Sequence, residues 1–122
     1  MSTGKGPGRF RDFVPPYQPT KTQTLTASGT VIAGTAGYQI VIEYFTAQNK
    51  GSASIGITPK NGTVPFDDGN VIPSTEGSNF YSFGAPAPGR EWRCDAGSPF
   101  VVTLSASGSV ATNTRYWLQG TA

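Results

Sequence analysis

YQIVIEYFTAQNK, residues 38–50, is the longest run without glycine or proline after residue 22, and its pattern decides the fold. Side chains along it alternate with a period of two residues rather than 3.6, which predicts a β-strand. Strict alternation puts Ile40, Ile42 and Tyr44 on one face with Tyr38, and it puts on the other face Gln39, Val41, Glu43 and Phe45. Because the second face mixes polar and apolar residues, we expect a strand that is packed on one side and partly covered on the other.

Shorter segments with the same alternation lie on both sides of this run. The clearest are residues 22–27, 53–58, 100–107 and 114–119, and shorter candidates are residues 30–32, 70–72, 80–83 and 91–94. The side chains expected to face inward are Ile55, Ile57, Phe100, Val102 and Leu104. Eight or nine short strands without a helical segment predict an all-β fold, either a two-layer sandwich or a barrel. Of these, a single jelly-roll-like antiparallel β-sandwich is the version that we expect.

Turn signals separate the predicted strands. Residues that tolerate positive φ occur at Ser28-Gly29, Asn49-Lys50-Gly51, Asn61-Gly62 and Asp68-Gly69, as tight strand connections require. The stretch from 58 to 99 is rich in such residues, so we expect it to hold the longer excursions across an end or a face of the sandwich.

Length and composition limit what else the chain can be. At 122 residues it forms one domain, because a second would have no core of its own. Charged residues make up 13% of the chain, against about 25% in typical soluble domains, and a surface this poor in charge tolerates close contact with neighbours. Cys94 is the only cysteine, so no internal disulfide can form and packing must hold the fold.

Residues 1–21 differ in composition from the rest. They contain Pro7, Pro15, Pro16 and Pro19 together with Gly4, Gly6 and Gly8, a mixture that cannot hold a helix and that removes donors from a strand ladder. Four basic side chains and one acidic side chain give this segment a charge of +3, which leaves −1 for the remainder of a chain whose net charge is +2. We therefore predict an extended basic N-terminal arm, residues 1–21, attached to a β-sandwich domain, residues 22–122, and an acidic partner for the arm.

The arm also contains large side chains that disordered tails usually lack. Apolar anchors alternate there with arginines, and the residues predicted to bind a partner are Arg9, Phe10, Arg11, Phe13, Val14 and Tyr17. Arginine interleaved with one aromatic ring is also a minimal nucleic-acid contact, but three residues are too few to predict nucleic-acid binding.

The sequence argues against an enzyme. It contains no histidine, which removes the usual general base, the commonest metal ligand and every nucleophile pair that depends on histidine. Three glutamates are by type candidates for a carboxylate hydrolase, although nothing in their spacing joins two of them: Glu43, Glu76 and Glu91. Cys94 stands between Arg93 and Asp95 and is better explained as a small buried residue than as a thiolate. We expect no catalytic residue and no cofactor.

Two further motifs have competing explanations. Asp67-Asp68-Gly69-Asn70 offers oxygen ligands of the kind that calcium prefers, but the full loop pattern is missing, so a solvated turn is favoured and no metal site is predicted. Asn61-Gly62-Thr63 fits a glycosylation sequon and is better explained as a hairpin turn. The start of the chain lacks the apolar core of a signal peptide, and no stretch approaches about 18 apolar residues. We therefore expect no membrane partner, and synthesis in a cytoplasm.

Five segments together suggest a family. These are the arm TGKGPGRFRDFVPPYQP, the following TQTLTASGTV, the strand GYQIVIEYF, and the C-terminal SPFVVTLSAS and TRYWLQG. In this arrangement the chain resembles the small β-sandwich decoration, or cement, proteins of tailed-bacteriophage capsids. Members of that group commonly sit as trimers on three-fold or quasi-three-fold positions and tie neighbouring coat subunits together through extended arms. The resemblance implies a homotrimeric virion structural protein on the capsid surface, assembled in the host cytoplasm, which binds the major capsid protein and has no direct contact with nucleic acid.

Two alternatives stay open at this point. The chain could be a receptor- or glycan-binding module of a head fibre or tail fibre that uses Trp92, Trp117 or the loops around Tyr81, since aromatic rings can stack on sugars as well as pack in a core or an interface. It could also be a minor tail or baseplate component built on the same sandwich.

Overall fold

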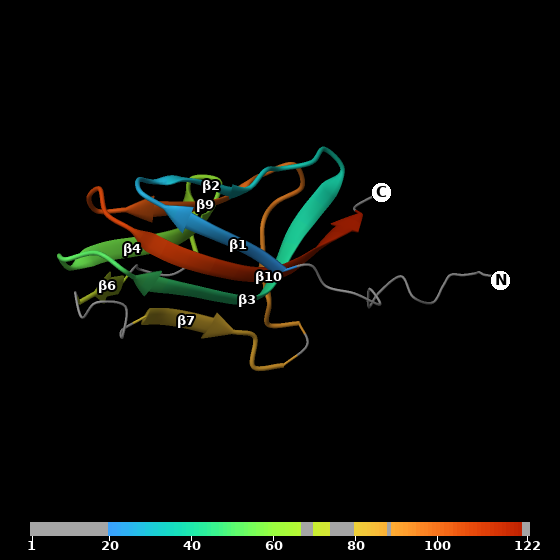
Figure 1. Cartoon of the computed structure of the whole chain (residues 1–122). Helices are drawn as coiled ribbons and strands as arrows, with labels where there is room; N and C mark the ends of the chain where they lie inside the picture. Colours follow the sequence, from blue (N-terminus) through green and yellow to red (C-terminus); the bar gives the residue numbers. More distant parts are fainter. Residues whose placement is uncertain (1–19, 67–69, 74–79, 88, 121–122) are drawn as a thin grey trace.

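Two antiparallel β-sheets face each other in the computed structural model, which describes residues 20–66, 70–73, 80–87 and 89–120 (Figure 1). The first sheet has the order β1-β10-β3-β7, with β8 also paired to β3, and its strands are β1 (Thr20–Leu25), β10 (Val110–Gly120), β3 (Tyr38–Asn49), β7 (Phe80–Gly84) and β8 (Trp92–Arg93). The second sheet has the order β2-β9-β4-β5, with β6 also paired to β4, and its strands are β2 (Gly29–Ile32), β9 (Phe100–Leu104), β4 (Ile55–Asn61), β5 (Val64–Pro65) and β6 (Asn70–Ile72). The predicted all-β sandwich is confirmed, because every regular element in the described residues is a strand.

Every predicted strand segment overlaps an observed strand, with differences at the ends. β10 begins at Val110, four residues before the predicted start at 114, and the short strand β5 was not predicted. β1 begins at Thr20, two residues inside the segment that composition assigns to the arm. The observed start follows directly after Pro19, whose missing N–H cannot serve a strand ladder.

A β-bulge interrupts β3 at Glu43. In the pairing with β10, Tyr44 lies opposite Arg115 and Ile42 lies opposite Tyr116, so that Glu43 is an extra residue without a partner on β10. A bulge of this kind adds one residue to one strand and therefore reverses which face the following side chains occupy.

The bulge makes the predicted face assignment of this strand wrong. Ile40 and Ile42 reach the core before the bulge, and Phe45 and Ala47 reach it after the bulge. Tyr44, which was expected to share the face of Ile42, is 41% exposed, whereas Phe45 is fully buried. One side of the long strand thus stays apolar although strict alternation does not hold along it.

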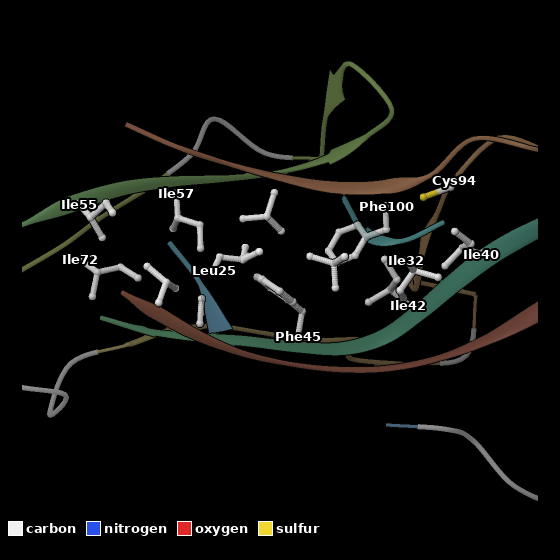
Figure 2. Packing of buried hydrophobic residues seen from close by; sticks show 14 residues of the cluster. Leu25, Ile32, Ile40, Ile42, Phe45, Ile55, Ile57, Ile72, Cys94 and Phe100 are labelled. Atoms are coloured by element: carbon white, nitrogen blue, oxygen red, sulfur yellow. The ribbon is translucent and has the colours of Figure 1, made fainter. Parts of the chain in front are cut away.

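The core lies between the two sheets, as Figure 2 shows. It consists of Leu25, Val31, Ile32, Ile40, Ile42, Phe45, Ala47, Ile55, Ile57, Ile72, Cys94, Phe100, Val102 and Val110. Phe45 and Phe100 join the sheets through an edge-to-face contact, with ring centroids 5.4 Å apart and planes at 86°. The predicted inward positions Ile55, Ile57, Phe100 and Val102 are confirmed, and Leu104 packs against the rim of the core as a half-buried residue.

Among the predicted turns, the one at Asn61-Gly62 is confirmed. Asn61 pairs with Val64 across the hairpin of β4 and β5, and Gly62 has a φ of 61°, which favours glycine. Gly29 and Gly51 do not have positive φ, so the prediction that these two turns need a residue with positive φ there is wrong. The Asp68-Gly69 turn lies outside the described residues.

Candidate functional site

The chemically reactive side chains of the domain are held in structural contacts. Cys94 is buried, and its Sγ lies 3.7 Å from the carbonyl oxygen of Pro99. Burial, reinforced by the negative charge of Asp95, raises the pKa of the Cys94 thiol to about 12. The thiol therefore stays protonated near neutral pH, which confirms its expected character as a small buried residue and argues against a nucleophile.

Sheet pairing brings two of the candidate glutamates closer than the sequence suggested. Trp92 lies opposite Ile42, which places Glu91, the residue before β8, beside the bulge at Glu43. Each carboxylate has its own arginine: Glu43 Oε1 lies 3.8 Å from an Arg115 nitrogen, and Glu91 Oε1 lies 3.7 Å from an Arg93 nitrogen.

Two further contacts hold the ends of this group. The Arg93 guanidinium donates a hydrogen bond of 2.8 Å to the Gln119 side chain, and the Gly89 N–H donates to the Glu91 carboxylate at 3.1 Å. The result is two separate ion pairs, in which the Glu91 side chain is 10% exposed and Glu43 Oε1 is buried without a hydrogen bond. Glu76, the third candidate, lies outside the described residues.

Trp92 is enclosed by aromatic rings. The Phe83 ring is parallel to the indole with centroids 3.9 Å apart, and the Phe66 ring is parallel to it with centroids 4.9 Å apart. Two phenyl rings at these distances would overlap if they shared one face of the indole, so they cover opposite faces. This three-ring stack joins β7 and β8 of the first sheet to the residue that follows β5 of the second sheet, and it leaves no face of Trp92 for a sugar.

The other two aromatic candidates for sugar binding lie apart from Trp92. Tyr81 packs toward the core, with its ring centroid 6.0 Å from that of Phe45. Trp117 is half-buried on β10 and lies opposite Val41 on β3. Since Tyr116 packs on the core, its neighbour Trp117 belongs to the outer face of the first sheet.

Most of that outer face is polar and uncharged. A shallow depression on it is lined by Tyr44, Thr46, Gln48 and Asn113, and the Thr22 hydroxyl donates a hydrogen bond of 2.9 Å to Asn113 on the neighbouring strand. At the end of the sandwich, the turn after β3 and the turn before β10 line a cavity of about 220 Å³. Its one deeply buried polar side chain, Asn49, already uses its amide in hydrogen bonds to Ala53, Ile72 and Gly51, so the cavity offers a charged or reactive ligand no dedicated partner.

β10 has an open edge along its second half, here called the open β10 edge, which consists of residues 116–120. β1 pairs with β10 only from Val110 to Arg115, whereas β3 pairs with it as far as Gly120. No strand in the described part of the chain lies along the other side of residues 116–120. Two large apolar side chains are exposed there, Leu118 at 43% and Tyr38 at 44%. Sequence reasoning missed this surface, although the uncharged run YWLQG after Arg115 was a signal for it.

Several predictions concern residues outside the described ranges. These are the six arm residues predicted to bind a partner, Arg9, Phe10, Arg11, Phe13, Val14 and Tyr17, and the acidic turn at Asp67 and Asp68. Within the described ranges, no group of three or more side chains of the metal-binding types is placed to hold an ion. Those same residues contain no helix that is long and apolar enough to cross a membrane.

In comparison with known proteins, no family model, no curated protein and no solved structure matches the chain.

Proposed function

We propose that this protein decorates and stabilises a tailed-phage capsid by bridging major coat subunits through its arm and its sandwich. In this proposal the chain performs no reaction, forms a homotrimer on the outer surface of the shell, and touches the coat protein rather than the packaged DNA. Phe10, Phe13 and Tyr17 fill apolar pockets on neighbouring subunits, with Val14 beside them, while Arg9 and Arg11 pair with coat carboxylates.

The observation that carries the proposal is the point at which the arm joins the domain. β1 is an edge strand, and it keeps a regular register with β10 from Thr20 to Leu25. The basic, proline-rich segment is therefore attached to a sheet edge rather than to a strand in the middle of a sheet. A segment attached there can extend onto another surface, where main-chain hydrogen bonds and alternate side-chain pockets provide binding.

The strand order favours a jelly roll within the sandwich. The strands pair as nested partners, β1 with β10, β2 with β9, β3 with β7 and β4 with β6, and the first four strands alternate between the two sheets. A long hairpin rolled around itself gives this order, and double-sheet jelly rolls occur in viral capsid domains. The connectivity thus agrees with a shell protein, although fold alone does not assign function.

Physical requirements of a capsid agree with this architecture. Packed DNA pushes outward on the coat, and a clamp resists by adding buried contacts across subunit boundaries. Repetition of a modest contact around a symmetry axis raises the overall affinity without any new kind of contact. The low content of charged residues, 13%, lowers repulsion between closely packed copies.

The test is binding of purified protein to shells that lack it. Removal of residues 1–19 keeps all of β1, and we expect the truncated protein to stay folded while its occupancy on shells falls by about 10-fold or more. The full-length variant with Arg9→Ala and Arg11→Ala should bind weakly, whereas a matched control that loses two domain lysines, Lys50→Ala and Lys60→Ala, should bind normally. Full occupancy after removal of the arm would overturn the proposal.

The fibre alternative makes different predictions. Because both faces of Trp92 are covered, a glycan-binding module would depend on Trp117, and Trp117→Ala would abolish dose-dependent binding on a glycan array. The number of copies in purified virions separates the candidates as well. Hundreds of copies would support decoration, and a handful would support a fibre, tail or baseplate component.

A further inference from the structure

The open β10 edge has the features of an unfilled strand position. Figure 1 shows β10 continuing past the beginning of β1, with β3 along its other side. In an antiparallel sheet, alternate residues of such a segment turn their N–H and C=O groups away from the paired strand. Exposed Leu118 lies within this edge, so an added strand would gain apolar contact as well as main-chain hydrogen bonds.

This edge lacks the devices that usually block strand addition. Charged side chains, prolines, bulges and very short strands protect sheet edges, and several other edge strands have them, although β7 contains neither a charged residue nor a proline. β1 carries Lys21, β2 has a register shift between Thr30 and Ile32, β5 contains Pro65, and β8 is two residues long. Residues 116–120, YWLQG, contain no charge and no proline, and their register with β3 is regular.

The chain's own preceding residues are unsuited to fill the edge. If the register of β1 with β10 continued backwards from Thr20, Pro19 would stand opposite Tyr116, and Pro16 would stand opposite Gln119. In a strand, only every second residue donates its N–H to a given neighbouring strand. Pro19 and Pro16 belong to different alternating sets, so one N–H needed for pairing with β10 would be missing in either case. The open edge therefore calls for a strand from another chain.

Residues 8–14, GRFRDFV, are the longest proline-free run of the arm. Five residues, 15–19, separate them from Thr20, and five residues of β10, 116–120, make up the open edge. If the register of β1 with β10 continued through these five residues, residues 9–14 of the same chain would lie past Gly120 and could not cover the open edge. A neighbouring copy has no such restriction, and its segment is long enough to cover the edge.

We propose that residues 9–14 of a neighbouring copy of this chain add as a strand to the open β10 edge. The two alternating rows of that segment match the two faces of the edge. One row is Phe10, Asp12 and Val14, whose two apolar side chains suit Tyr116 and Leu118 on the core side, with Asp12 between them. The other row, Arg9, Arg11 and Phe13, then lies on the side of Trp117, whose indole can accept a guanidinium on its face.

The contact joins two different surfaces, the arm of one copy and the β10 edge of the next. Such heterologous contacts close into rings when the rotation permits, which is what a trimer requires. The inference goes beyond the proposed function, because it concerns how copies bind each other in the absence of a shell. Phe10 and Val14 bind either this edge, in the absence of a shell, or the coat pockets of the proposed function, so a copy whose arm is bound to the coat leaves the edge of its neighbour open.

The first test is sedimentation of the purified full-length protein over a range of concentrations, without any shell. We expect concentration-dependent self-association that is lost on removal of residues 1–14, which keeps Pro15–Pro19 of the linker and all of β1. Full-length Leu118→Glu should also lose it, because Glu repels the carboxylate of Asp12 and does not pack with Phe10 or Val14. A matched exposed substitution on the opposite end of the sandwich, Ala106→Glu, should leave it unchanged. A protein that is monomeric at every concentration, or one that still associates without residues 1–14, would overturn the proposal and would leave the shell-binding proposal standing.

The second test identifies the contact directly by disulfide formation between two chains. One chain carries one introduced cysteine in the arm, which replaces Phe10, Asp12 or Val14 in turn. A second, size-tagged chain carries Leu118→Cys. Residues paired across strands come close enough for a disulfide, and buried Cys94 does not compete. We expect a covalent heterodimer with at least one arm position and none when Ala106→Cys replaces Leu118→Cys. Equal yields with the two acceptor positions, or no heterodimer from any arm position, would contradict the proposed pairing.

Discussion

The Asn49 side chain donates a hydrogen bond to the Ile72 carbonyl oxygen, with the two atoms 3.0 Å apart, and so joins the end of β3 to β6 in the other sheet. The same amide donates to the Ala53 carbonyl oxygen at 2.8 Å and accepts from the Gly51 N–H at 2.9 Å. One buried polar residue thereby shapes the turn that connects the sheets and forms hydrogen bonds with main-chain groups of three other residues.

Asn49→Leu removes all three hydrogen bonds and leaves the buried Ile72 carbonyl group, together with partly buried groups of Ala53 and Gly51, without that partner. We expect the free energy of unfolding to fall by about 2–4 kcal/mol, because unsatisfied buried polar groups keep their desolvation penalty. Urea denaturation measures the change. Asn113→Ala is the matched control, because it removes one partly exposed contact with Thr22 and should cost less than about 1 kcal/mol. Equal losses for the two variants would contradict the role assigned to Asn49.

Substitution of adjacent residues after the bulge tests the reversed face of β3. Phe45→Ala removes a buried ring that contacts Phe100 and should lower the free energy of unfolding by about 3–5 kcal/mol. Tyr44→Ala, on a side chain that is 41% exposed, should cost about 1 kcal/mol or less. Thermal and urea unfolding of the pair decide the matter, and the opposite order of effects would restore strict alternation and remove the bulge.

Close backbone packing requires glycine at one position outside the strands. A Cβ on Gly34 would overlap the carbonyl group of Gly97, so Gly34→Ala should destabilise the domain by about 1–3 kcal/mol. Gly29→Ala is the comparison, since the nearest atoms to its added Cβ are 4.0 Å away. That variant should stay within about 1 kcal/mol of the parent or exceed it in stability. Midpoints of thermal unfolding that shift equally for both variants would argue against the contact.

The pKa of Cys94 predicts a specific dependence of stability on pH. The folded-state pKa is about 12, above the ordinary value of 9.0, because burial and Asp95 disfavour the thiolate. The stability contributed by the neutral thiol is fully present below about pH 9 and is lost as pH rises toward 12. Because lysines and tyrosines titrate in the same range, the measurement is a difference: Cys94→Ala should lose less stability than the parent between these pH values.

Reactivity gives an independent check on the same residue. A thiol reagent should modify native Cys94 slowly at pH 8 and rapidly only when denaturant opens the sandwich, since the thiolate is the reacting species. Rapid labelling of native protein would place the thiol in an accessible, ionised state instead.

Much of the strand pattern could be predicted from local sequence, but one strand shows where such prediction ends. The first half of β10 reads VATNT, and its Thr112 and Thr114 are fully buried. An alternation rule treats threonine as polar and so misses these positions. Thr112 is accommodated because its hydroxyl donates a hydrogen bond of 2.8 Å to the Gln23 carbonyl oxygen on β1, a residue 89 positions away.

The candidate functional surfaces also differ in whether the sequence alone could predict them. The arm residues Arg9, Phe10 and Phe13 could be singled out from composition alone. That both faces of Trp92 are covered could not be predicted, because Phe83 lies on β7 and Phe66 follows β5 of the other sheet, and the two reach Trp92 only in the folded sandwich. The open β10 edge likewise exists only because the pairing of β1 stops at Arg115, five residues before the end of β10.

By itself, the sequence determined the all-β class, the approximate places of most strands and the presence of a basic arm before the domain. These follow from side-chain period, turn residues and proline content, which act within a few residues of chain. The tertiary structure alone decided the bulge at Glu43, the face on which Phe45 lies and the partner that each strand finds. Those features depend on pairing between residues far apart in sequence, where register and packing of both sheets are chosen together.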